Sequence, residues 1–293
     1  TPESFTKYAG GAPANVAVGI SKLGGKSSFC GMIGDDMFGQ FLHQELTHYG
    51  VNTDYCLYTS KAKTALAFVS LNNEGDRSFS FYRPPAADLL FKEKHFKPQM
   101  FNEHQYFHFC SNSLTEKSIY NATLSGLNMA KFHGALISFD VNLRLNLWPH
   151  TRDTAQRIWH CISNAHVLKL AKEELTYLTL NSNKLSSDEQ TLTRCLTLGV
   201  SYIIVTDGDK PIMLYSKSGQ YEVCVPSVQA TDPTAAGDSF MAGVLFTLQK
   251  NQHTLENLTD HLLIDAIEFG AKCAAVTVTR YGSFTALPTQ NEC

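Results

Sequence analysis

The chain has 293 residues, of which 43% are hydrophobic and 17% are charged. These proportions are typical of a globular protein with a sizeable core, built as one large domain or as a domain with a small appendage. The formal net charge is −3, with both signs scattered along the chain, which argues against the basic face that a nucleic-acid-binding protein needs. No apolar run approaches the roughly 18 residues of a membrane-spanning helix.

The cysteines do not predict a metal site. None of the eight lies in a C-x-x-C pair, and their spacing is wide and irregular, unlike that of zinc ligands. Several lie in apolar runs, where cysteine behaves as a small hydrophobe, and we expect a reducing cytoplasm. The sequence begins TPES without a Met, so a preceding signal or transit segment stays open.

Short apolar runs alternate with amphipathic segments along the chain. Strands are predicted at 27–34, 105–110, 135–141, 166–170 and 201–206, and helices at 36–50, 116–132, 153–163 and from 173. Such alternation predicts a three-layer, Rossmann-like α/β fold, with a mostly parallel sheet covered by helices on both faces.

Two places break this alternation. The runs 64–71 and 77–83 flank NNEGD, which predicts two antiparallel strands joined by an Asn/Gly turn. We interpret them as a small β lid, contributed mainly by 62–88, within a single domain of 1–293. Later in the chain, PIMLY and QYEVCV predict a hairpin.

The motif GGAPAN is the first candidate for ligand binding. Its paired glycines, Gly10 and Gly11, let the backbone approach a ligand closely, and the next helix is expected to begin near Ala14. Asn15 offers a donor and an acceptor to hydroxyl groups. A plain Gly-rich turn before a helix explains the motif equally well, and it is neither G-x-G-x-x-G nor a Walker A loop.

The motif TDPTAAGDSF is a sharper signal. The small residues Ala235, Ala236 and Gly237 lead into a helix, and free amides at a helix N-terminus can hold an anion. Asp238 falls in the first turn of that helix, where its carboxylate can take a proton from a hydroxyl group. A helix-capping acid is the alternative, and the motif alone does not decide between the two.

Three further candidates follow predicted strands, at the sheet edge where open α/β sheets bind ligands. Arg144 in FDVNLR suits a phosphate, Glu174 in KLAKEEL suits a magnesium-bound water, and Thr206 in VTDGD suits a nucleotide. Each has an alternative: Arg144 as an exposed loop arginine, Glu174 on a solvated helix face, and Thr206 in a simple turn at the strand end.

Taken together, GGAPANVAVGISKLGG, GMIGDDMFG, FYRPPAAD, FDVNLRLNLWP and DPTAAGDSF resemble the PfkB/ribokinase family of carbohydrate kinases, and within it the bacterial fructokinase branch. The resemblance covers nearly the whole chain. It implies a ribokinase-like fold with a β lid, and transfer of the γ-phosphoryl group of ATP to a primary sugar hydroxyl, with fructose 6-phosphate as the expected product.

The resemblance also implies residue roles. Asp238 is the expected base, beside an anion hole at 235–237. The expected sugar-binding positions are Gly10, Gly11, Asn15, Arg83 and Arg144. The expected nucleotide-binding positions are Thr206, Gly208 and Gly237. Glu174 matches the magnesium motif. A potassium ion is expected near Asp232, Thr234, Thr277, Arg280 and Gly282, and a homodimer is expected through 64–83.

The sequence departs from the family pattern in several places. The family has a strand with a sugar-binding acid before GGxxxN, whereas nine residues precede Gly10 here, and relatives usually have a final helix after TALP. Ala171 replaces the Asn of the magnesium motif, and Pro211 stands where a second glycine is common. Two alternatives therefore stay open: the same fold acting on ribose, 2-keto-3-deoxygluconate or a nucleoside, and a sugar- or nucleotide-binding regulator without turnover.

Overall fold

The computed structural model describes residues 4–71, 77–83, 85–102, 105–148, 153–182 and 184–293. Its helices are α1 (Ala12–Lys22), α2 (Met37–His48), α3 (Gln99–Asn102), α4 (Lys117–Phe132), α5 (Thr154–Ile162), α6 (Lys172–Leu180), α7 (Asp188–Thr197), α8 (Ala236–Lys250) and α9 (Asp260–Val278). Its strands are β1 (Gly31–Gly34), β2 (Cys56–Thr59), β3 (Leu66–Leu71), β4 (Arg77–Tyr82), β5 (Tyr106–Cys110), β6 (Leu136–Asp140), β7 (Val167–Ala171), β8 (Tyr202–Asp207), β9 (Lys210–Ser216) and β10 (Gln220–Val223).

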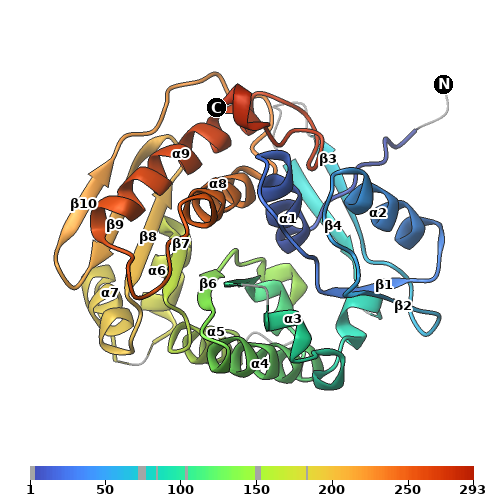
Figure 1. Ribbon diagram of the computed structural model, residues 1–293, viewed down its shortest axis with the longest axis horizontal. Coiled ribbons are helices and arrows are strands. Elements are labelled where there is room, and N and C mark those ends of the chain that lie inside the picture. The colour runs from blue at the N-terminus through green and yellow to red at the C-terminus, as the bar shows by residue number, and fades with distance from the viewer. Residues whose placement is uncertain (1–3, 72–76, 84, 103–104, 149–152, 183) are drawn as a thin grey trace.

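The main sheet has the strand order β10-β9-β8-β7-β6-β5. Strands β5 to β8 are parallel, and β9 and β10 add an antiparallel hairpin at one edge. Helices α1, α8 and α9 cover one face and α4 to α7 the other, so the predicted three-layer fold and the late hairpin are confirmed (Figure 1). No helix of the described segments is long and apolar enough to cross a membrane.

The strand predicted from Ser27 lies outside the main sheet. Strand β1 pairs in parallel with β2 in a separate two-stranded sheet, with Gly31 opposite Cys56. This corrects the expectation that the early strand joins the parallel sheet. The partner β2 was not predicted, because its four residues, CLYT, are too few to show a period-2 pattern.

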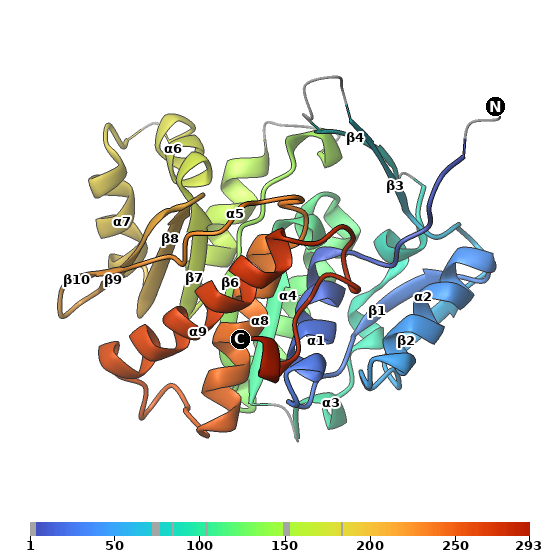
Figure 2. The same cartoon turned by 90° about the horizontal axis from the view of Figure 1, so that it is seen from above.

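The predicted lid is present as the antiparallel pair β3–β4, with Leu66 opposite Tyr82 and Leu71 opposite Arg77. Figure 2 shows this pair standing apart from the main sheet, beside the N-terminal segment. The NNEGD turn at 72–76 falls outside the described residues.

Helices α8 and α9 cross closely, and this contact fixes the helix that carries Asp238. A Cβ on Gly243 would lie 2.7 Å from the Cα of Gly270. A Cβ on Gly270 would in turn lie 2.7 Å from the carbonyl oxygen of Phe240. The two helix backbones therefore touch where each has no side chain.

We expect Gly270→Ala to destabilise the protein, because the added methyl group has to push the α8 backbone away. Overpacking of this kind costs about 1–3 kcal/mol, which exceeds the helix propensity gained by alanine. Urea unfolding measures the loss, with the exposed α9 variant Glu268→Ala as control. Equal stability of the two variants would show that the crossing tolerates a side chain.

Candidate active site

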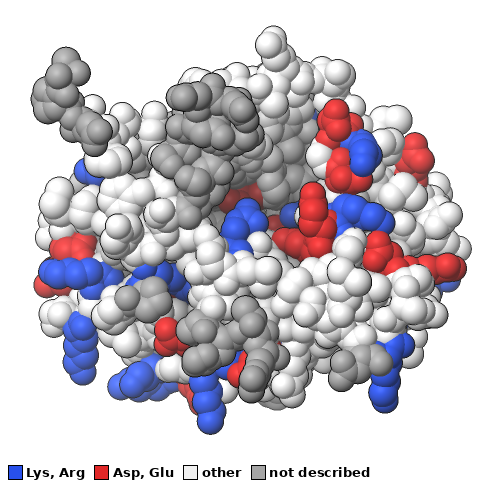
Figure 3. All heavy atoms as spheres, turned by 180° about the vertical axis from the view of Figure 1, so that it is seen from behind, with Lys and Arg blue, Asp and Glu red and all other residues white. Residues whose placement is uncertain are grey.

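The site lies where the parallel strands end. A cavity of about 2400 Å³ opens there, and Figure 3 shows acidic and basic side chains gathered around a hollow on this face. Most of the predicted site residues line it: Gly10, Gly11, Asn15, Arg83, Arg144, Glu174, Thr206, Asp232, Thr234, Ala235, Ala236, Gly237, Asp238 and Gly282. Three predicted residues are not part of its lining: Gly208, Thr277 and Arg280.

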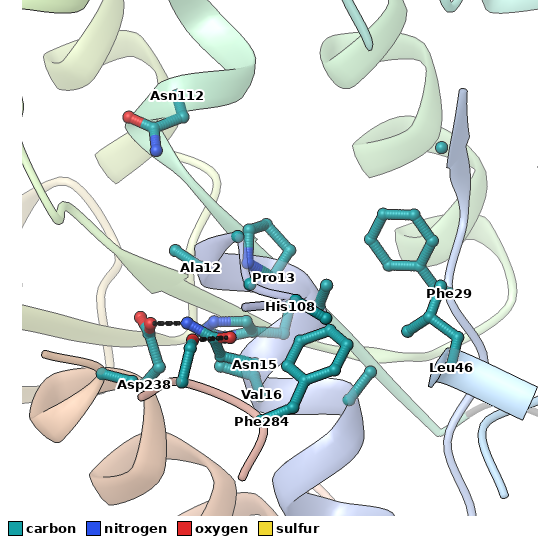
Figure 4. Close-up of a pocket in the computed structure, with 18 of the residues that line it drawn as sticks. Ala12, Pro13, Asn15, Val16, Phe29, Leu46, His108, Asn112, Asp238 and Phe284 are labelled. Carbon is teal, nitrogen blue, oxygen red and sulfur yellow. Dashed lines mark hydrogen bonds between the residues drawn. The ribbon is translucent and has the colours of Figure 1, made fainter. Parts of the chain in front are cut away.

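Asp238 lies in the first turn of α8 and is only 7% exposed. Its Oδ2 accepts a hydrogen bond of 2.6 Å from Asn15 Nδ2, and its Oδ1 accepts one of 3.1 Å from Asn142 Nδ2. Figure 4 shows Asn15 and Asp238 pointing at each other, with Phe29 and Leu46 at the far end of the cavity. The carboxylate is thus fixed by two amides from opposite sides of the sheet edge.

The environment of Asp238 places its titration in a range useful for catalysis. Burial raises its pKa from 3.8 to about 6, and the nearby charge of Asp140 also raises it. The hydrogen bond from Asn15 and the positive charges of Lys169 and Arg144 lower the pKa, so they limit the rise. The group is therefore ionised at neutral pH, yet it is more basic than an exposed aspartate.

The N-terminus of α8 presents free backbone donors. Ala235 adopts a left-handed conformation, with φ 60°, and turns the chain into the helix. The amide of Ala236 donates to the carbonyl of Pro233 at 3.2 Å. Within the described segments, the amides of Gly237 and Asp238 have no hydrogen-bond acceptor. This geometry fits the anion hole predicted at 235–237.

Asn15 is held as firmly as the carboxylate it contacts. It is 4% exposed, and its Oδ1 accepts a hydrogen bond of 2.6 Å from Ser283 Oγ. Both ends of the amide therefore already have protein partners, one of which is Asp238. Gly10 lies against the same serine, since a Cβ there would be 2.9 Å from Ser283 Oγ.

Glu174 is not on a solvated helix face, which corrects that alternative. It is 7% exposed, and its two oxygens accept hydrogen bonds from the amides of Leu143 at 2.6 Å and Ala171 at 2.8 Å. Burial raises its pKa above the ordinary range, while Lys169 and the two amides lower it. Its carboxylate joins the ends of β6 and β7.

A buried ion pair lies next to the start of α8. Lys169 Nζ on β7 is 3.1 Å from Asp140 Oδ1 on β6, and the two side chains are 7% and 1% exposed. Burial alone would lower the pKa of Lys169, but the charges of Asp140 and Glu174 outweigh it and raise that pKa. Lys169 therefore stays a cation in a site that also contains three carboxylates.

Only some of the residues predicted to bind potassium lie close together. Asp232 Oδ1 accepts from the amide of Thr234 at 2.7 Å, and Oδ2 accepts from the amide of Gly282 at 3.3 Å. Thr277 is fully buried, and its carbonyl accepts the amide of Arg280 at 3.1 Å. The Arg280 side chain turns to Glu292, at 2.6 Å.

The two predicted arginines differ in their freedom to bind a ligand. Arg83 is 8% exposed, and its Nε and Nη2 both donate to Asp88 Oδ2. It also donates to Thr115 Oγ1 and to the carbonyl of Asn112, so it ties the base of the lid to the main domain. Arg144 is exposed, and its Nη1 donates to the neighbouring Leu143 carbonyl at 3.0 Å.

The predicted nucleotide loop follows β8. Thr206 pairs with Ala171 at the end of the β7–β8 ladder, and the pairing of β8 with β9 has an irregularity between Val205 and Asp207. Gly208 adopts φ 61° in the turn to β9. Thr206 therefore faces the ligand cavity, whereas Gly208 shapes the turn beyond it.

Sequence reasoning missed several residues of this site: Asp140, Asn142, Lys169 and Ser283. Asp140 and Lys169 carried a usable signal, because a charged residue inside an apolar strand run is costly unless it is paired. Asn142 adopts φ 38°, a conformation that asparagine tolerates better than most residues. Ser283 gave no local signal, since only the fold brings it to Asn15.

The fold and the site define a phosphotransferase of the ribokinase-like kind, in which a buried carboxylate faces free helix amides. The family model described as pfkB family carbohydrate kinase matches residues 1–290. The chain therefore belongs to the pfkB family of carbohydrate kinases.

Curated proteins and solved structures that are similar to this chain are also carbohydrate kinases. Probable fructokinase-5 of Arabidopsis thaliana is 38% identical over 97% of this chain and 86% of the relative. A fructokinase from Xylella fastidiosa with bound ATP superposes with a TM-score of 0.95 at 41% identity, over 100% of this chain and 92% of that one. A fructokinase from Vibrio cholerae with fructose, ADP and calcium bound gives 0.90 at 31% identity, over 99% and 92%.

We expect kcat to fall as the pH drops through about 6, because a base has to be deprotonated to act and burial raises the pKa of Asp238 to that value. Asn15→Ala should move this midpoint upward, since the lost hydrogen bond favours the ionised form. A kcat–pH profile measures both, with Ser21→Ala on the same helix as control. An unchanged midpoint in Asn15→Ala would contradict the assigned contact.

Proposed function

We propose that this protein phosphorylates fructose with ATP, giving fructose 6-phosphate and ADP. The observation that carries the proposal is the buried carboxylate of Asp238 at the N-terminus of α8, beside the unpaired amides of Gly237 and Asp238. The fructokinase relatives, which span nearly the whole chain, support the choice of fructose.

In the proposed reaction Asp238 accepts the proton of the primary hydroxyl. The hydroxyl oxygen forms a bond to the γ-phosphorus while the bond between that phosphorus and the ADP oxygen breaks. The amides at the start of α8 stabilise the negative charge of the moving phosphoryl group. Asn15 and Asn142 hold the carboxylate in the orientation that receives the proton.

The nucleotide and ions have residues of the right chemistry. Arg144 and Thr206 are proposed to contact ATP, because one is exposed and cationic and the other ends β8 at the cavity. Glu174 would hold a water of Mg²⁺, and Mg²⁺ supplies charge neutralisation on the phosphates. Asp232 and the loop around Gly282 would hold K⁺ beside the anion hole.

The acceptor is the least constrained part of the proposal. An aminoimidazole riboside kinase from Salmonella enterica gives a TM-score of 0.87 at 31% identity, so a riboside acceptor is the second candidate. Arg83 donates hydrogen bonds to Asp88, Thr115 and Asn112. We therefore propose that it shapes the acceptor pocket by holding the lid in place. A panel of fructose, ribose, 2-keto-3-deoxygluconate and nucleosides separates these acceptors.

We expect Asp238→Asn to lower kcat with fructose by at least ~10²-fold, because the amide cannot take the proton. Coupled ADP release measures the loss. The variant removes a carboxylate whose raised folded pKa destabilises the protein once it is ionised at pH 7. It also turns one of the hydrogen bonds from Asn15 and Asn142 into a contact between two donors, so we expect the two effects on stability to oppose each other.

A thermal melt of Asp238→Asn provides the control for folding. Wild-type turnover retained in this variant would remove the base assignment. Absence of ADP release with every sugar of the panel would remove the kinase proposal for this chain.

We also propose a homodimer that forms through the lid, at 64–83. Two large apolar side chains there are exposed, Val69 at 45% and Tyr82 at 68%. Val69→Lys with Tyr82→Lys should shift the protein to monomer in sedimentation velocity at micromolar concentration. Leu180→Lys, at an exposed position outside the lid, is the control. A monomeric wild type would contradict the proposal.

The cytoplasmic location stays a prediction.

A further inference from the structure

Lys169 is a buried cation with unused donors. Lys169 is 5% exposed, and among the described residues its Nζ forms an ion pair with Asp140 Oδ1, at 3.1 Å. An ammonium group carries three N–H donors, and in the described part of the chain no further acceptor is found for them. Two donors are therefore left for a partner outside the protein.

The ammonium group lies next to the start of α8. A Cβ built on Gly237 would be 3.1 Å from Lys169 Nζ and 4.0 Å from Asp140 Oδ2, so the pair packs against the backbone at the start of α8. Lys169 also lines the cavity that contains Asp238 and Thr206. Its charge is thus next to the amides that receive the phosphoryl group.

The ion pair of Lys169 and Asp140 lies within strands that are otherwise mostly apolar. The neighbours of Lys169 and Asp140 along β6 and β7 are fully buried apolar residues, Phe139, Leu168 and Leu170. A buried ion pair costs desolvation and adds little stability compared with apolar residues. Asp140 Oδ2 is buried and has no hydrogen-bond partner among the described residues, so these residues satisfy the pair only in part. Such a pair beside a reaction centre indicates a role in the chemistry.

We propose that Lys169 is a catalytic residue whose ammonium group contacts the transferring phosphoryl group in the cavity beside Gly237, while Asp140 is the positioning residue that orients it. This inference rests on the proposed kinase function. Lys169 stays protonated throughout, so it adds no proton transfer to the reaction. Its charge offsets the negative charge on the phosphoryl oxygens as the group moves from ADP to the acceptor.

The single variant Lys169→Met is ambiguous by itself, because it leaves Asp140 buried without its counter-charge and can impair folding. The double variant Lys169→Met with Asp140→Asn removes both charges and avoids that problem. A role in transition-state stabilisation predicts that kcat falls by ~10²-fold or more in both variants, as for loss of one oxyanion donor. KM for fructose should change by only a few-fold.

The pH profile provides a readout that a merely structural role would not move. Asp238 is faced by Asn15 on α1, Asp140 on β6, Lys169 on β7 and the charge of Arg144, and Cys110 on β5 is also coupled to it. Lys169→Met alone should raise the pH at which kcat is half-maximal, because the positive charge of Lys169 lowers the pKa of Asp238. Removing Asp140 with it should return the midpoint toward the wild-type value, while kcat stays low.

A binding measurement tests the contact without turnover. Isothermal calorimetry with ADP plus aluminium fluoride in the presence of fructose mimics the phosphoryl group in transfer, and ADP alone is the control ligand. We expect the double variant to bind ADP like the wild type and to bind the ADP–aluminium fluoride mixture ~10-fold or more weakly.

Wild-type kcat in a folded double variant, or equal binding of the mixture by both proteins, would overturn the role of Lys169 and leave the kinase proposal intact. A wild type that phosphorylates no sugar would instead overturn the kinase proposal. The calorimetric comparison would still decide whether Lys169 binds the phosphoryl mimic.

Discussion

The site depends on one buried hydrogen bond, from Asn15 Nδ2 to Asp238 Oδ2. It joins residues 223 positions apart and connects the first turns of α1 and α8. Burial raises the pKa of the carboxylate, and this bond lowers it, so the balance near 6 depends on both. Ser283 fixes the other end of the Asn15 amide, which means that the final segment of the chain also controls the orientation of the base.

The ends of the parallel strands are where buried charge is tolerated in this fold. Asp140 ends β6, Lys169 lies near the end of β7, and Glu174 bridges to both strands through backbone amides. Lys169 offsets part of the desolvation cost of both carboxylates, whereas Asp140 raises the pKa of Glu174 by repulsion. The cluster packs against the start of α8, where a Cβ on Gly237 would lie 3.1 Å from Lys169 Nζ.

The candidate site and the lid belong to different parts of the architecture. Asp238 and the amides at the start of α8 belong to the α/β body, whereas the lid pair β3–β4 stands apart from it. Arg83, at the base of the lid, joins it to the body through hydrogen bonds to Thr115 Oγ1 and to the carbonyl of Asn112. Proteins of this fold act on fructose and on aminoimidazole riboside, as the names of its structural neighbours state.

The sequence by itself determined the strand–helix alternation, the lid hairpin, the late hairpin and Asp238 in the first turn of a helix. Hydrophobic periodicity, turn residues and small residues before a helix are local signals, so one chain suffices to find them. Tertiary structure alone placed β1 and β2 in a separate sheet, buried Glu174, and brought Ser283 to Asn15 and Lys169 to Gly237. These facts depend on contacts between residues distant in sequence, and local propensity carries no information about which distant residues meet.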